Sequence, residues 1–156
     1  MKTHSCPVIG CIRTPFESKE NCPVQPALSG KAAGRVEVLA EYAPALQDIE
    51  GFSHLILLYQ MDKAGEVILV RPTFFDKHPH GIFASRHPCR PSGIGLSVVR
   101  LRAVEGNVLL IEGIDVLDNT PLLDIKPYLP QYDCYPEASQ GWTENVSSRE
   151  KTMGRE

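Results

Sequence analysis

The sequence predicts an all-β domain, because frequent turn residues divide it into short apolar runs. Its 156 residues include 13 prolines and 12 glycines, and no long run with the helical period of about 3.6 residues survives between them. Residues 54–61 are apolar at nearly every position after the first, which indicates a strand buried on both faces in the middle of a closed or covered sheet. A chain of this length suits one domain with a single core.

Seven strands are predicted, each as an apolar or alternating run between turn residues. In chain order they are residues 6–12, 35–39, 54–61, 67–72, 83–86, 95–104 and 108–116. The last two are joined by Glu105, Gly106 and Asn107, which favour a hairpin turn. Residues 41–49 are the predicted helical turn, with Pro44 near its start. Residues 143–156 are polar and aperiodic, so a flexible tail is expected after a domain over residues 1–142.

Basic residues are concentrated in one part of a chain whose net charge is −3. Between Lys63 and Arg102 there are seven basic and two acidic residues, so this stretch carries +5 and the rest of the chain carries −8. Three of the five histidines, His78, His80 and His87, also lie in this stretch. One basic face on an acidic body suits a polyanion that docks in one place. An ordinary solvated surface fits the same charge pattern equally well.

Several classes of protein are disfavoured by what the sequence lacks. No apolar run approaches the roughly 18–20 residues of a membrane span, and no apolar leader opens the chain, so a cytoplasmic protein is expected. No Gly-x-Gly-x-x-Gly, P-loop or Gly-x-Ser-x-Gly motif occurs. The five cysteines are expected to be reduced thiols. No metal site is predicted, since the spacing of His4, Cys6, Cys11 and Cys22 fits no usual zinc pattern.

Two proline-rich segments could bind a ligand. In residues 9–28, the stiff loop Pro23-Val24-Gln25-Pro26 could turn its carbonyls and Gln25 toward a ligand, although an ordinary rigid loop explains it as well. In residues 83–101, Arg86 and Arg90 lie four positions apart on a proline-braced loop. Fixed guanidinium groups suit phosphate or carboxylate recognition, and surface ion pairing is the equal alternative.

A third segment, residues 111–133, combines acids, a lysine and tyrosines around several prolines. Its Asp-Asn-Thr-Pro stretch is favourable turn chemistry by itself. The following acids, amine and aromatic rings exceed what a turn requires, and they could grip a cation, stack a base or move a proton.

Together, and in this order, the three segments resemble the TsaA-like family, the tRNA methyltransferase O family. The family pattern runs I-G-x-I-x-S-P-F, P-x-Q, E-G-F-S-H-L, F-A-T-R-S-P-x-R-P-N-P-I-G-L-S and D-G-T-P-x-L-D-I-K-P-Y. The matching residues are 9–16, 23–25, 50–55, 83–97 and 118–128, and the resemblance covers residues 8–142. It implies a single-sheeted β-barrel that binds S-adenosylmethionine, usually as a homodimer. The implied reaction methylates the exocyclic nitrogen of threonylcarbamoyl-adenosine beside the anticodon of certain tRNAs.

The resemblance, carried over position by position, implies eleven cofactor contacts. They are Pro23, Val24, Gln25, Asp62, Lys63, Arg86, Leu96, Asp118, Asn119, Thr120 and Pro121. The chain departs from the family pattern at Ser92 and Gly93, where Asn-Pro is common, and this change is expected to loosen the loop. It departs again at Asn119, where glycine is common; asparagine can adopt a positive φ, so the turn is expected to persist.

The acceptor nitrogen of such a substrate is a weak nucleophile, so a base that takes up its proton is expected. From residue type and position the candidates are Asp124, Tyr128 and Asp133, with Lys126 holding negative charge on the substrate. Arg90 and His87 are expected to bind tRNA phosphates or the threonyl carboxylate.

Some family members carry an additional C-terminal domain, for which this chain is too short. Its grip on tRNA is therefore expected to come from the barrel, from a dimer partner or from both. Two other interpretations stay open at this point. One is a non-catalytic β-barrel module that binds S-adenosylmethionine or a nucleotide, and the other is a methyltransferase that acts on a substrate other than tRNA.

Overall fold

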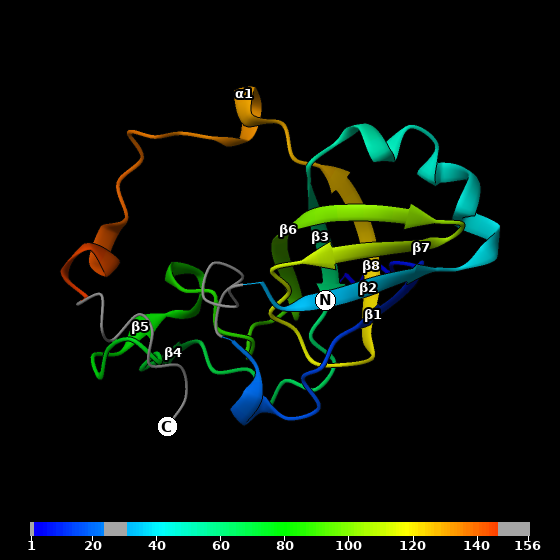
Figure 1. Ribbon diagram of the computed structural model, residues 1–156. Helices are drawn as coiled ribbons and strands as arrows, with labels where there is room; N and C mark the ends of the chain where they lie inside the picture. Colours follow the sequence, from blue (N-terminus) through cyan, green and yellow to red (C-terminus); the bar gives the residue numbers. More distant parts are fainter. Residues whose placement is uncertain (1, 24–30, 147–156) are drawn as a thin grey trace.

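A closed antiparallel barrel of six strands dominates the computed structural model, which describes residues 2–23 and 31–146 (Figure 1). The strands are β1 (Gly10–Arg13), β2 (Ala33–Val38), β3 (His54–Gln60), β6 (Ile94–Glu105), β7 (Val108–Glu112) and β8 (Thr120–Pro127). Around the barrel the order is β1-β2-β7-β6-β3-β8, and the pairing of β1 with β8 closes it. Closure leaves the barrel without an unpaired sheet edge. The predicted all-β fold and single-sheeted barrel are confirmed.

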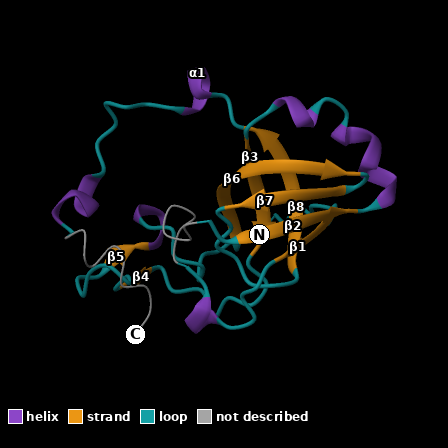
Figure 2. Ribbon diagram, viewed as in Figure 1, coloured by secondary structure: helices purple, strands orange, loops and turns teal. Residues whose placement is uncertain are grey.

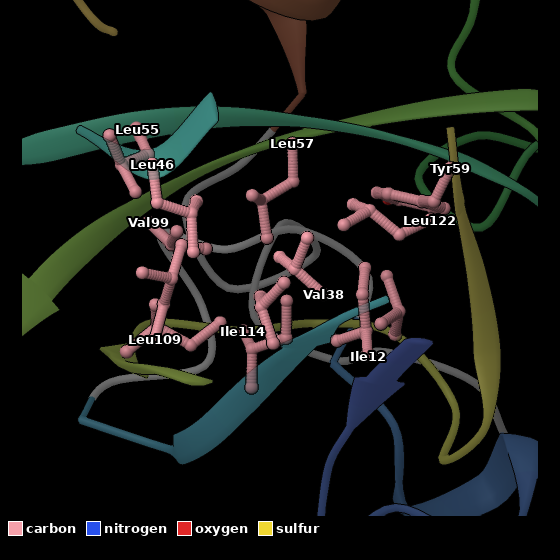
Figure 3. Packing of buried hydrophobic residues seen from close by; sticks show 13 residues of the cluster. Ile12, Val38, Leu46, Leu55, Leu57, Tyr59, Val99, Leu109, Ile114 and Leu122 are labelled. Carbon is pink, nitrogen blue, oxygen red and sulfur yellow. The ribbon is translucent and has the colours of Figure 1, made fainter. Parts of the chain in front are cut away.

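The core lies inside the barrel, because successive strand residues point alternately inward and outward. On β3, Leu55, Leu57 and Tyr59 are buried, and Figure 3 shows inward side chains from all six strands meeting there. The outward Ile56 and Leu58 are half-buried. β3 pairs with both β6 and β8, which confirms the prediction of a strand within a closed sheet. The prediction that both of its faces are buried is wrong for the outer face, which is only half-buried.

The predicted strands of the first half need correction. β1 begins at Gly10 and not at residue 6, and Pro7 has no N–H to donate to a strand ladder. The predicted strand 67–72 is reduced to β4 (Val70–Arg71), which pairs with β5 (His80–Gly81) as a separate two-stranded ribbon (Figure 2). The predicted strand 83–86 is wrong: the chain makes a 3-10 turn at Ile82–Ala84, closed by the Ser85 N–H on the Ile82 carbonyl oxygen.

In the second half of the chain, the structure differs from the prediction at the end of β7 and at β8. β7 ends at Glu112 and not at residue 116, because Gly113 takes a φ of +83°, outside the strand region. β8 was not among the predicted strands, since proline is its second and its last residue and two charged side chains lie near its end. It nevertheless pairs with both β1 and β3, and so completes the barrel.

Short 3-10 helices cover one mouth of the barrel, where β3 begins and β8 ends. The predicted helical turn 41–49 is split into Ala40–Leu46 and Ile49–Gly51, and Pro44 lies inside the first of these instead of near its start. Leu46 is buried against the core. We call this end the far mouth; Figure 1 shows these helices beside the β6–β7 hairpin.

The C-terminal segment leaves the barrel through the single-turn helix α1 (Pro130–Asp133) and returns beside the β4–β5 ribbon (Figure 1). There a 3-10 helix, Gly141–Asn145, packs Trp142 onto the ribbon, with its Nε1 donating to the Ala84 carbonyl oxygen at 2.8 Å. The predicted tail begins inside this helix, and its residues 147–156 lie outside the described part of the chain. No helix in residues 2–23 and 31–146 is long and apolar enough to cross a membrane.

Gly95 allows the Tyr59 ring to lie across β6. The two residues are directly opposite in the β3–β6 register, and a Cβ at position 95 would lie 2.1 Å from Tyr59 Cε2. That distance is far inside van der Waals contact, and both positions are buried, so the ring would have to move.

Gly95→Ala is expected to lower the free energy of unfolding by about 1–3 kcal/mol, because the added methyl group displaces the Tyr59 ring. Urea denaturation followed by circular dichroism measures the loss. Gly51→Ala is the matched control, since a Cβ there meets nothing within 4 Å. Equal losses in the two variants would contradict the close packing of Tyr59 on Gly95.

Candidate active site at the near mouth

A cavity of about 790 Å³ opens at the near mouth, opposite the far mouth covered by 3-10 helices. Its walls come from the end of β3, the start of β6, the β7–β8 loop and the start of β8 on the barrel side. The β4–β5 ribbon and the loop of residues 85–90 form the other side. Such a volume is typical of pockets that enclose a small organic ligand.

Most of the described residues that the resemblance assigns to the cofactor line this cavity. They are Pro23, Asp62, Lys63, Arg86, Leu96 and Thr120. Val24 and Gln25 lie outside the described residues. Asp118, Asn119 and Pro121 do not line the cavity but lie beside it, since the Lys63 Nζ donates to the Asp118 carbonyl oxygen at 3.0 Å. The structure thus brings together segments more than ninety positions apart in sequence, from Pro23 to Thr120.

The turn at Asn119 has the backbone conformation that its sequence predicts. Asn119 has a φ of 65°, which confirms that asparagine can replace the glycine common in the family. The turn is tied to the end of β1: the Thr14 N–H donates to Asp118 Oδ1 at 3.0 Å, and the Arg13 guanidinium contacts the Asn119 side-chain oxygen. This anchoring fixes the segment that leads into the cavity wall at Thr120.

The departure from the family pattern at Ser92 and Gly93 also makes a defined turn. Gly93 has a φ of +60°, its N–H donates to the Arg90 carbonyl oxygen at 3.1 Å, and its own carbonyl accepts the Met61 N–H at 2.7 Å. Proline holds φ near −65° and has no N–H, so the common Asn-Pro pair could not form this turn. These two hydrogen bonds close the turn, and the expected change in loop flexibility stays a prediction.

The two residues predicted to bind the substrate both line the cavity, but in different settings. Arg90 is held at the rim by a bond from its Nη1 to the Ser85 carbonyl oxygen at 2.9 Å, and its guanidinium lies 6.0 Å from the centre of the Phe83 ring. Phe83 is 78% exposed. His87 is buried, and its Nδ1 accepts the Cys89 N–H at 3.1 Å. Arg90 is therefore the better placed of the two to meet a large substrate.

The residues predicted to act in catalysis lie toward the far mouth and do not line the cavity. Asp124 and Lys126 pair with each other at 2.8 Å on the outer face of β8. The Tyr128 N–H donates to the His54 carbonyl oxygen, and the Asp133 carboxylate accepts the N–H of Leu129, the residue that precedes helix α1. A strand rises about 3.3 Å per residue, so Lys126 is about 20 Å along β8 from the cavity.

A buried chain of hydroxyl groups ends at a carboxylate in the cavity, and sequence reasoning did not predict it. The Tyr59 hydroxyl lies 2.9 Å from Ser97 Oγ, and Ser97 Oγ donates to Asp115 Oδ1 at 2.5 Å. Burial, and then the charge of Asp115, raise the pKa of the Tyr59 phenol. The phenol therefore stays protonated and donates to Ser97, so that both hydroxyl groups point their hydrogen atoms toward Asp115.

Asp115 was missed because the predicted strand ran through it to residue 116. The early end of β7 instead leaves Asp115 on a connecting loop, which is well anchored. The Cys22 thiol donates to the Asp115 carbonyl oxygen at 3.0 Å, and the Thr14 hydroxyl donates to the Val116 carbonyl oxygen at 2.8 Å. An acid two residues after Gly113, at the end of an apolar run, was the signal in the sequence.

All five cysteines are free thiols, and Cys22 and Cys89 are buried at the cavity wall. In the described part of the chain, no three His, Cys, Asp or Glu side chains come close enough together to hold a metal ion.

Residues 11–134 match the family described as the tRNA-methyltransferase O N-terminal domain. A probable S-adenosyl-L-methionine-binding protein of Pyrococcus abyssi is 46% identical over 145 residues, which cover 92% of this chain and 78% of the relative. The tRNA (adenine(37)-N6)-methyltransferase of Escherichia coli is 36% identical over 155 residues, which cover 93% of this chain and 66% of the relative.

Solved structures share the fold. A crystal structure of TrmO matches with a TM-score of 0.78 at 43% identity, covering 90% of this chain and 64% of that one. A crystal structure of TrmO from Pseudomonas aeruginosa matches with a TM-score of 0.76 at 40% identity, covering 90% of this chain and 63% of that one. The chain thus spans less than two thirds of the length of either solved chain.

Proposed function

The chain belongs to the tRNA-methyltransferase O family, and from this premise we propose that it transfers a methyl group from S-adenosylmethionine to N6 of an adenine in tRNA. The proposed acceptor is the exocyclic nitrogen of threonylcarbamoyl-adenosine next to the anticodon, in the cytoplasm. The observation that supports this function most is the near-mouth cavity, which is lined by six of the eleven predicted cofactor positions and by the anchored carboxylate of Asp115.

The lining of the cavity fits S-adenosylmethionine in size and in chemistry. Met61, Ile94 and Leu96 offer apolar surface for the adenosine. The carboxylate of Asp62 complements the positive charges of the cofactor, and the nearby arginines complement its carboxylate. The cofactor supplies an activated methyl group on a positively charged sulfur atom. The protein therefore has to align the acceptor nitrogen, exclude water and take up a proton.

We assign the proton uptake to Asp115. Its carboxylate lines the cavity and is oriented by the hydroxyl groups of Ser97 and Tyr59, which are 0% and 6% exposed. As the acceptor nitrogen is methylated, its proton passes to a carboxylate oxygen of Asp115 and from there to solvent. The catalytic roles predicted for Asp124, Lys126, Tyr128 and Asp133 require a second copy of the chain, because within one copy they lie away from the cavity.

The rim of the cavity suits a nucleotide that is turned out of an RNA loop. Phe83 is exposed and lies beside the anchored guanidinium of Arg90. Aromatic rings and guanidinium planes are the surfaces on which proteins stack unpaired RNA bases. Arg90 is also free to approach phosphate through its remaining donors.

A homodimer is part of the proposal. Val67, Ile68, Leu69 and Val70 form a run of consecutive apolar residues that are 42–63% exposed. Exposed apolar patches of this kind commonly mark protein–protein contacts. Light scattering is expected to give twice the chain mass of 17.3 kDa, and a monomer that is fully active at the same concentration would contradict the dimer.

The function is tested by incubating the protein with labelled S-adenosylmethionine and one tRNA sequence, prepared with and without the threonylcarbamoyl group. Nucleoside mass spectrometry then locates the methyl group. Label on N6 of the modified adenosine alone is the expected result. Cofactor binding without transfer to either tRNA would support a non-catalytic binding module instead.

A further inference from the structure

Arg71 places a charged side chain in the cavity wall, although neither the motifs nor the family positions single it out. It is the second residue of β4 and lies directly opposite His80 of β5. Its side chain lines the same cavity as Lys63, Arg86 and Leu96. The β4–β5 ribbon therefore contributes a cation from the side that faces the barrel across the cavity.

The Nε atom of Arg71 is buried and has no hydrogen-bond partner among the residues that the structure describes. A buried donor without an acceptor costs about 1–3 kcal/mol, and a charged one costs more. Native proteins rarely leave such a group unpaired, and an ion, a water molecule or a ligand usually accounts for the exceptions. The unpaired Nε thus indicates that an acceptor other than the residues 2–23 and 31–146 completes this wall.

Two acids lie nearest to Arg71 in sequence, Glu66 and Asp76, each five positions away, and Asp76 is engaged elsewhere. Asp76 is the one acidic residue between positions 67 and 104. Its carboxylate accepts the His78 N–H at 2.7 Å and pairs with the His80 Nε2 at 3.2 Å. The His78 N–H, followed by the His80 side chain, lowers the pKa of Asp76. Asp76 therefore stays charged and bound to these two histidines.

Stacked rings hold the ribbon that carries Arg71 in place. The His80 ring stacks on Trp142 with centroids 3.9 Å apart and planes 14° apart. Trp142 is itself fixed by its bond to the Ala84 carbonyl oxygen at 2.8 Å. On the same side of the cavity, Phe74 stacks on His87 at 5.3 Å. A ribbon held in this way loses little further conformational freedom when its arginine binds a ligand.

We infer that Arg71 binds a carboxylate group in the cavity, through Nε and one Nη of its guanidinium. Two parallel N–H bonds to one carboxylate are the geometry that a guanidinium favours. The inference rests on the proposed function, under which both occupants of the cavity end in a carboxylate. One is the amino-acid end of S-adenosylmethionine, and the other is the threonyl group of the modified adenosine.

The experiment compares Arg71→Gln and Arg71→Lys with Arg102→Gln. Arg102 is the matched control, because it lies on β6 outside the cavity and pairs with Glu112 at 3.3 Å. Each variant is titrated with S-adenosylmethionine, with decarboxylated S-adenosylmethionine, and with tRNA that carries or lacks the threonylcarbamoyl group. Unchanged thermal unfolding shows that each variant is folded.

Arg71→Gln is expected to weaken one carboxylate-bearing ligand about 10- to 100-fold, as for the loss of charge-assisted bonds. Arg71→Lys should lose less, since lysine keeps the charge without the planar fork. A loss for S-adenosylmethionine that spares its decarboxylated form assigns the carboxylate to the cofactor. A loss for modified tRNA that spares unmodified tRNA assigns it to the substrate.

The inference is overturned if Arg71→Gln binds all four ligands within twofold of Arg102→Gln, or weakens ligands with and without the carboxylate equally. These are binding measurements, so they decide the inference independently of catalysis. Failure of the proposed function would appear separately, as an absence of methyl transfer by the wild-type protein.

Discussion

Asp115→Asn is expected to lower the rate of methyl transfer to tRNA about 100- to 10,000-fold, the range that a positioned proton acceptor contributes. The amide has nearly the shape of the carboxylate, and its oxygen can still accept the Ser97 hydroxyl. It cannot take up the proton of the acceptor nitrogen. Affinity for S-adenosylmethionine should therefore stay within about threefold of the wild type. The single-turnover rate of methyl transfer to modified tRNA should fall by the factor given above.

Asp48→Asn is the matched control for this change. Asp48 is exposed near the far mouth and has a φ of 65°, a conformation that asparagine adopts as readily as aspartate. Its transfer rate should equal that of the wild type. If Asp115→Asn transfers methyl groups as fast as Asp48→Asn, the proton acceptor lies elsewhere. Asp124→Asn would then be the next variant to measure, in the dimer.

Leu57→Ala is expected to lower the free energy of unfolding by about 2–5 kcal/mol, because it removes a side chain from the centre of the barrel. Leu57 is 0% exposed and lies in the middle of β3, between β6 and β8. Small domains are stable by only about 5–15 kcal/mol, so a large share of the total is lost. Urea denaturation measures the change.

Leu39→Ala serves as the control for the core substitution, since Leu39 is 47% exposed just after β2. Its cost should be within about 0.5 kcal/mol, as for most surface changes. Similar losses in the free energy of unfolding for the two variants would mean that packing inside the barrel is not the main source of folding stability.

The barrel could be predicted from the sequence because its central strands have clear local patterns. β3, β6 and the β6–β7 hairpin were placed to within a few residues by apolar runs and by the turn at Gly106. β8 could not be placed, since it shows no such run and is specified by pairing with β1 and β3, both distant in sequence. Its strand state follows from barrel closure and not from local propensity.

The site could be predicted only in part, for a related reason. Motif positions predicted the cofactor segments, and most of the predicted residues that the structure describes line the cavity. Asp124 and Lys126 belong to the same motif as Thr120, yet the extended strand carries them to the other end of the barrel. Asp115 and Arg71 reach the cavity through a β7–β8 loop and a two-stranded ribbon whose positions depend on tertiary contacts.

Equilibrium titration of S-adenosylmethionine into the wild type, Arg86→Ala and Arg102→Ala tests most directly whether the near-mouth cavity is the cofactor site. Arg86 lines the cavity, whereas Arg102 lies outside it on the same chain. We expect binding about 10- to 100-fold weaker for Arg86→Ala, from the loss of a charge-assisted contact, and unchanged binding for Arg102→Ala. Wild-type affinity in Arg86→Ala would contradict the placement of the cofactor in this cavity.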